Sequence, residues 1–207
     1  MRVPGRLAIP VVVVLLALAA WWAWSAHEAR SQQRAIAALV TEASAEMRNW
    51  LEATPTQEHV IAAESRLEAL ADMRTSQREE FARAAELYLV GARALAQRQV
   101  DAARLAAQAQ ASERALAAHM AGAARRSPGW IREATELRRR MSEAYGDLYR
   151  TEEAVAEIAA SMPEAASRLA PYMPRSSILG ESAFRAAQKR AEARAEAARA
   201  KQQSGGS

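Results

Sequence analysis

The chain has 207 residues, of which 53 are alanine and only 35 are Leu, Ile, Val or Phe, and its net charge is +4. So few large aliphatic residues argue against an ordinary packed globule, while abundant alanine with only 8 glycines and 7 prolines favours helix. This composition excludes a β-sandwich, a doubly wound α/β enzyme and a collagen-like chain. The absence of cysteine excludes disulfide frameworks and thiolate metal sites. We expect an all-α protein in which an N-terminal transmembrane helix precedes an antiparallel, coiled-coil-like helical bundle.

A short basic tail at residues 1–6 precedes an uncharged apolar run at residues 7–24. A helix of this length extends about 27 Å, close to the hydrocarbon core of a bilayer at about 30 Å, so the run predicts a transmembrane anchor. Trp21, Trp22 and Trp24 lie together at the end of the run, where an aromatic belt at the membrane interface is expected.

A cleaved signal peptide is the alternative, with Arg2 and Arg6 as its basic region and Ala17, Leu18 and Ala19 as its cleavage motif. We favour the uncleaved anchor because the apolar run continues beyond that motif. In the usual signal-anchor arrangement the tail stays inside and the domain is exported. The sequence therefore predicts a single-pass inner-membrane protein with its C-terminal domain in the periplasm.

Residues 25–170 are expected to form the bundle. The first helix, over residues 25–53, is predicted by apolar residues at steps of three and four: Ile36, Leu39, Val40, Ala43, Met47, Trp50 and Leu51. Thr54 and Gln57 form a capping-box pattern, with Pro55 at the first position of a second helix over residues 55–73.

Residues 74–80 are polar and predict either a turn or a solvated helix. One helix over residues 79–125 would be about 70 Å long, much longer than its neighbours, which makes a break near residues 97–101 plausible.

Ser127 before Pro128 predicts a helix N-cap, and the most regular pattern in the chain follows it. Apolar residues recur at alternating steps of four and three up to Met162, as in the seam of a bundle or coiled coil. We favour core packing over ligand binding for this candidate seam, which contains Trp130, Leu137, Met141, Tyr145, Leu148, Val155 and Ile158. Residues 161–164 resemble another cap, which predicts a separate short helix before a loop at residues 171–180.

Residues 181–207 predict an Ala-, Arg- and Glu-rich helical tail that carries the positive excess. Its candidate contact residues are Arg185, Lys189, Arg190, Arg194 and Arg199. Clustered basic residues are typical of proteins that bind nucleic acid or acidic surfaces. Interleaved glutamates disfavour nucleic acid, as does the scarcity of aromatic residues to stack on bases, since Phe184 is the only one in this segment. A solvated helix is favoured over an acidic partner.

The sequence contains none of the catalytic or cofactor motifs that we recognise, and His27, His59 and His119 are too far apart for a helical zinc motif. We assign no catalytic residue, no metal and no cofactor, and we do not expect an enzyme.

Two resemblances bear on function. Residues 88–103 resemble one helical hairpin of the tetratricopeptide family, with Gly91 in the tight packing position and Ala103 in the second helix. Arg98 or Gln99 stands where that family has a turn glycine. This resemblance implies partner binding. The anchor followed by four amphipathic helices resembles the periplasmic sensor bundle of chemoreceptors, although no second membrane segment or signalling domain is present to transmit a signal.

The sequence thus predicts a membrane-anchored helical scaffold or adaptor that acts by protein–protein interaction in the bacterial cell envelope. Its partners would be the membrane and proteins of an envelope complex. Self-association into a homo-oligomer is a further alternative. The alternative is a sensory or ligand-binding bundle, or a tetratricopeptide-like module. A polar-lined pocket near Trp130 and Tyr145 would favour that alternative.

Overall fold

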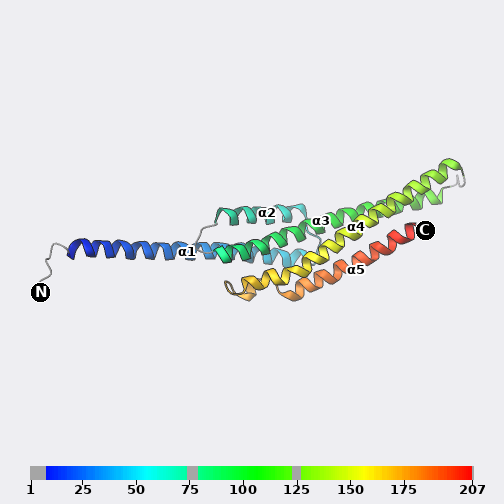
Figure 1. The fold of residues 1–207 in the computed structure, drawn as a ribbon. Helices are drawn as coiled ribbons and strands as arrows, with labels where there is room; N and C mark the ends of the chain where they lie inside the picture. The colour runs from blue at the N-terminus through cyan, green and yellow to red at the C-terminus, as the bar shows by residue number, and fades with distance from the viewer. Residues whose placement is uncertain (1–7, 74–78, 123–126, 207) are drawn as a thin grey trace.

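The computed structural model describes residues 8–73, 79–122 and 127–206, with side chains from residue 14 to residue 204, and these form an elongated helical bundle (Figure 1). This part of the chain contains five α-helices and no strand, which confirms the all-α class. The helices run in alternating directions in chain order, and they are α1 (Ala8–Trp50), α2 (Gln57–Asp72), α3 (Glu79–Ala121), α4 (Pro128–Leu169) and α5 (Glu181–Gly206), with a 3-10 turn, η1 (Arg175–Ser177), before α5.

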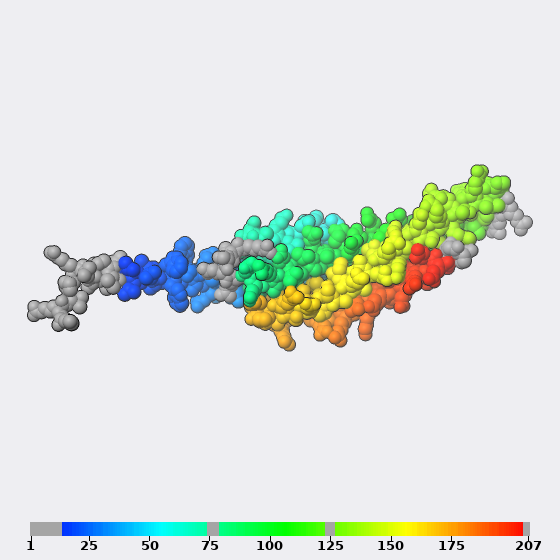
Figure 2. Space-filling view, in the orientation of Figure 1, coloured from blue at the N-terminus to red at the C-terminus, as the bar shows by residue number. Residues whose placement is uncertain are grey.

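The first helix joins the predicted anchor and the predicted first bundle helix into one. α1 has 43 residues and is about 65 Å long. Its C-terminal half packs in the bundle, where Ile36, Val40 and Met47 are at most 2% exposed. Its N-terminal part extends beyond the other helices, and every side chain over residues 14–24 is exposed (Figures 1 and 2).

No helix in the described part of the chain is both long and apolar enough to cross a membrane. The predicted anchor at residues 7–24 is therefore not supported by these residues. Leu7 and the side chains of residues 8–13 lie outside them, as does the predicted basic tail at residues 1–6. The section with described side chains, residues 14–24, extends only about 16 Å, roughly half of a hydrocarbon core.

The second helix begins two residues later than the sequence predicts. Thr56 is its N-cap residue in place of Thr54, and the Thr56 backbone N–H donates to Nδ1 of His59 at 3.1 Å. A capping box needs an acceptor side chain three residues after the cap, and here an imidazole supplies the acceptor in place of Gln57. Val60, Ala63 and Leu70 form the buried apolar face of α2.

The third helix is continuous, so the interruption considered near residues 97–101 is wrong. Ala96 and Ala102, on either side of that region, are 1% and 3% exposed. α3 packs along α4, a helix of almost equal length. Residues 74–78 of the polar stretch lie outside the described residues, and Glu79 already belongs to α3.

The tetratricopeptide hairpin is also wrong, because residues 88–103 lie within α3 with no turn between them. The family's turn glycine is replaced here by residues that continue a helix, and α3 does continue. Gly91 nevertheless lies at a close helix contact, since a β-carbon at this position would overlap the sulfur of Met162 on α4.

The start of the fourth helix is confirmed, because the Ser127 hydroxyl accepts a hydrogen bond from the Trp130 backbone N–H at 3.1 Å. The short separate helix expected after residues 161–164 is wrong, since α4 continues through Pro163 to Leu169. Met162 and Leu169 are at most 1% exposed. Core packing on both sides of Pro163 holds these turns in line despite the missing N–H.

The predicted loop reverses the chain and is well packed, with Met173, Ile178 and Leu179 at most 7% exposed. α5 then packs back along α4. Phe184 and a row of alanines on α5 are buried, namely Ala187, Ala191, Ala195 and Ala198. The predicted tail is helical, but it is part of the bundle and not a solvated extension, because small residues at steps of four and three let two helices approach closely.

Candidate functional site

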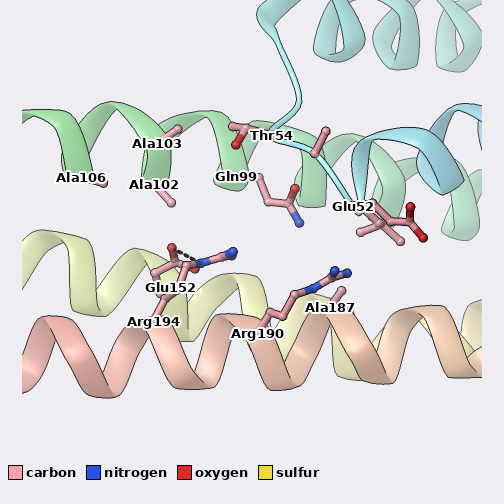
Figure 3. A pocket seen from close by; sticks show the side chains of 12 residues that line it. Glu52, Thr54, Gln99, Ala102, Ala103, Ala106, Glu152, Ala187, Arg190 and Arg194 are labelled. Atoms are coloured by element: carbon pink, nitrogen blue, oxygen red, sulfur yellow. Dashed lines mark hydrogen bonds and ion pairs between the residues drawn. The ribbon is translucent and has the colours of Figure 1, made fainter.

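A polar cavity of about 350 Å³ lies where α1 ends, between α3 and α5 and over α4 (Figure 3). After Trp50 the chain turns away toward α2, while α3, α4 and α5 continue. The small alanine side chains of α3 do not fill the space that is left. The lining residues are Leu51, Glu52, Ala53, Thr54, Gln99, Ala102, Ala103, Ala106, Glu152, Ala187, Arg190 and Arg194.

Glu152 of α4 is the only buried side chain with a formal charge among the described residues, at 4% exposure. Its Oε1 accepts a hydrogen bond from Nε of Arg194 at 2.7 Å. Its Oε2 is also buried and has no hydrogen-bond partner in the described part of the chain. A buried acceptor without a donor costs free energy, so this oxygen is a point where a donor from outside the chain would be favoured.

Two arginines one helical turn apart on α5 border the same cavity (Figure 3). Arg194 pairs with Glu152 through Nε, and its side chain is 51% exposed. Arg190 forms no ion pair or hydrogen bond with any residue that the structure describes. Gln99 extends toward this space from α3, and Glu52 lies at the end of α1. The lining therefore combines two cations and two carboxylates, which makes it polar but neutral in sum.

A second hollow, of about 340 Å³, lies between α4 and α5 and is acidic. Its polar lining consists of Tyr149, Glu153, Glu157, Glu192, Glu196 and Arg199. The Tyr149 hydroxyl donates to Glu153, and this hydrogen bond raises the tyrosine pKa. Arg199 lies 5.8 Å from the centre of the Tyr149 ring, a cation–π distance. All four glutamates are exposed, so water can solvate this hollow without a ligand.

The predicted seam of α4 lies inside the bundle. Met141, Tyr145 and Leu148 belong to a small cluster with alanines of α3 and α5, and Val155 belongs to the larger core. Ile158 packs at the edge of that core, and Trp130 and Leu137 are half-buried. These side chains mainly hold helices together, and neither cavity is lined by Trp130 or Tyr145.

The predicted basic contacts divide into two kinds. Arg185, Arg194 and Arg199 each contact another side chain of the chain, namely Glu181, Glu152 and the Tyr149 ring. Lys189 and Arg190 form no ion pair with a described residue. The three tryptophans of the predicted interface, Trp21, Trp22 and Trp24, are 63%, 71% and 69% exposed.

The histidines with described contacts have structural positions. His59 caps α2, and His119 stacks on Trp130 with ring centroids 5.0 Å apart. Within residues 8–73, 79–122 and 127–206, no group of three or more potential metal ligands is found.

Sequence reasoning missed Glu152 as a site residue. A signal was present, because Glu152 follows Leu148 by four positions and precedes Val155 by three, which places a carboxylate on an otherwise apolar helix face. The cavity itself depends on where α1 ends relative to its neighbours, which no local pattern encodes. Comparison with known protein families, with characterised proteins and with solved structures finds no match to this chain.

Proposed function

We propose that this protein is a membrane-anchored helical scaffold or adaptor that acts by binding other proteins in the bacterial cell envelope. The observation that carries the proposal is the exposure of apolar side chains over residues 14–24 of α1, which extends beyond the bundle. Val14, Leu15, Leu16 and Leu18 are between 55% and 65% exposed.

A helix that is apolar around its whole circumference is stable only when apolar surroundings cover it. Exposed apolar patches of this kind mark membrane or protein contact. The sequence of residues 7–24 favours the membrane, because it is uncharged and ends in Trp21, Trp22 and Trp24, whose indole groups suit a bilayer interface. We therefore propose that this segment is the anchor and that lipid covers its apolar side chains.

We place the bundle in the periplasm and the anchor in the inner membrane. This placement rests on the signal-anchor arrangement, in which Arg2 and Arg6 stay on the inner side and the following domain is exported. The continuity of α1 would then hold the bundle at a fixed distance from the bilayer.

The partner is proposed to be a protein because the bundle exposes aliphatic side chains beside its charged surface. Ile61 of α2 and Leu87 and Val90 of α3 are between 47% and 58% exposed. Leu87 and Val90 are three positions apart and so share one helix face.

Membrane anchoring can be tested by alkaline extraction of membranes from bacteria that express the full chain. The wild type should stay with the membranes, and a Leu15→Asp/Leu18→Asp double variant should be released. A Leu87→Asp/Val90→Asp variant is the matched control, because it adds the same charge within the bundle and should stay. Release of the wild type by alkali would refute the anchor.

The adaptor role is tested separately. Detergent extracts of crosslinked cells should contain this chain in a complex with other envelope proteins. Isolation of the chain alone, as a monomer, would contradict it. A C-terminal reporter that is active only in the cytoplasm would contradict the proposed orientation.

A further inference from the structure

We infer that the cavity at the end of α1 binds a small zwitterion, a molecule of amino-acid or dipeptide size that carries both an ammonium group and a carboxylate. The cavity belongs to the bundle and lies away from the apolar section of α1, so this binding would not depend on the proposed anchor.

The ammonium end is indicated by Glu152. Its side chain is only 5% exposed, yet Oε2 has no hydrogen-bond donor among the described residues. Buried carboxylates are normally fully hydrogen-bonded, and a charged N–H donor forms the strongest such bond. An ammonium group in the cavity would therefore supply the missing donor.

The carboxylate end is indicated by the two arginines of α5. Arg194 uses Nε for Glu152, which leaves its two terminal nitrogens, and Arg190 has its whole guanidinium group without a described partner. Planar guanidinium groups bind carboxylates with two parallel hydrogen bonds. A highly charged anion such as phosphate fits less well, because Glu52 and Glu152 also line the cavity.

The size and the remaining walls suit such a molecule. A volume of about 350 Å³ lies at the small end of the range for small-molecule sites, which is about 300–1,000 Å³. Ala103 contributes apolar surface from α3, and Gln99 offers an amide that can donate and accept. A short aliphatic chain between the two charged ends would lie against this wall.

Isothermal titration calorimetry on the purified full chain tests the inference with glycine, β-alanine, 4-aminobutyrate and glycylglycine as probes. Butyrate and butylammonium serve as probes with one charge each. We expect at least one zwitterion to bind with a dissociation constant of about 1 mM or tighter, and about tenfold more tightly than either single-charge probe. Equal or weaker binding of every zwitterion would overturn the inference and leave the cavity as a gap solvated by water.

Variants then test the assigned ends. Glu152→Gln and Arg190→Gln should each weaken binding of the best zwitterion by about tenfold or more, and Ala103→Leu should abolish it by filling the cavity. Lys189→Gln removes a neighbouring charge that does not line the cavity, and it should bind as the wild type does. If Glu152→Gln does not fold, the Arg190→Gln and Ala103→Leu variants test the inference without it. Both residues are exposed, so these substitutions should leave the fold intact. Unchanged affinity in these two variants would overturn the inference.

Discussion

The Tyr88 hydroxyl of α3 and the Ser44 hydroxyl of α1 form a buried hydrogen bond of 2.8 Å. Tyr88 is 0% exposed and Ser44 is 2% exposed. The Tyr88 oxygen also accepts from the Leu179 backbone N–H at 3.4 Å, so one side chain connects α1, α3 and the loop before α5. Burial raises the Tyr88 pKa, and the hydroxyl therefore stays protonated at neutral pH.

Replacing Tyr88 by phenylalanine should destabilise the bundle. The change leaves the Ser44 hydroxyl without its partner, and an unsatisfied buried polar group costs about 1–3 kcal/mol. We expect the free energy of unfolding, measured in urea, to fall by about that amount. Tyr149→Phe is the control, because among the described residues the Tyr149 hydroxyl bonds only to Glu153, on the surface of its own helix. Its loss should change stability by less than about 0.5 kcal/mol. Equal effects of the two variants would contradict the buried bridge.

The two glycines at helix contacts should respond to alanine in opposite directions. At Gly91 a β-carbon would overlap the Met162 sulfur, which is held in the core at 1% exposure. Overpacking costs about 1–3 kcal/mol, while alanine regains up to about 1 kcal/mol of helix propensity. Gly91→Ala should therefore lower the free energy of unfolding by about 1–2 kcal/mol.

At Gly146 the nearest obstacle is the far end of a flexible side chain, the amide of Gln202, 2.8 Å from the β-carbon position. Gln202 lies near the end of α5 and can rotate away. Gly146→Ala should thus raise the free energy of unfolding by up to about 1 kcal/mol. Urea denaturation of both variants measures the contrast, and a loss of stability at Gly146 would show that α5 is held more tightly there than its contacts indicate.

The sequence was sufficient to predict the all-helical class and which residues of several helices are buried. Apolar steps of three and four place Ile36, Val40 and Met47 on one face, and these side chains are buried. The Ser127 cap was predictable because a hydroxyl before Pro128 is a local signal that needs no tertiary partner.

Features that depend on neighbouring helices were not predictable in this way. α3 stays continuous and α4 passes through Pro163 because a helix of matching length lies alongside, and relative helix lengths are not visible in a local pattern. The cavity has the same origin, since it arises where α1 ends. Arg190 and Arg194 were recognised only as basic residues of α5, because their position beside Glu152 depends on how α5 packs on α4.

Removing Pro163 should stabilise α4. A proline inside a helix costs about 3 kcal/mol, and its restriction of the unfolded chain returns up to about 1 kcal/mol. Local adjustment of α4 around the proline reduces this net cost further. Pro163→Ala should therefore raise the free energy of unfolding by about 1–2 kcal/mol. Pro128→Ala, at the first turn of α4 where proline is tolerated, should change it by less than about 0.5 kcal/mol. Destabilisation by Pro163→Ala would mean that a local bend is needed to pack Met162.

The distal end of the bundle should weaken in acid because of one carboxylate. Glu113 of α3 accepts hydrogen bonds from Lys201 of α5 and from the Tyr145 hydroxyl of α4, the latter at 2.5 Å. Both bonds favour the ionised form, and the one from Lys201 has the larger effect, so the Glu113 pKa is lowered. Burial, and to a lesser extent the hydrogen bond to Glu113, raises the pKa of Tyr145 to about 12. The tyrosine therefore keeps its proton throughout the acid range.

The direction of the pH dependence follows from proton binding. In the unfolded chain Glu113 has the ordinary glutamate pKa of about 4.3, so the unfolded state binds more protons than the folded state below that pH. The contribution of Glu113 is thus complete above about pH 5 and is lost as pH falls through the lowered folded pKa.

Because the Glu113 carboxylate is 39% exposed, we expect it to contribute only about 0.5–1 kcal/mol to the free energy of unfolding at neutral pH. Glu113→Gln should be less stable than the wild type by that amount near pH 7 in urea denaturation, and the difference should shrink as pH falls from 7 to 3. Glu68→Gln removes an exposed glutamate with no described hydrogen bond or ion pair, and it should match the wild type near pH 7. A Glu113→Gln difference that stays constant across this range would show that the carboxylate does not link α3, α4 and α5 through its charge.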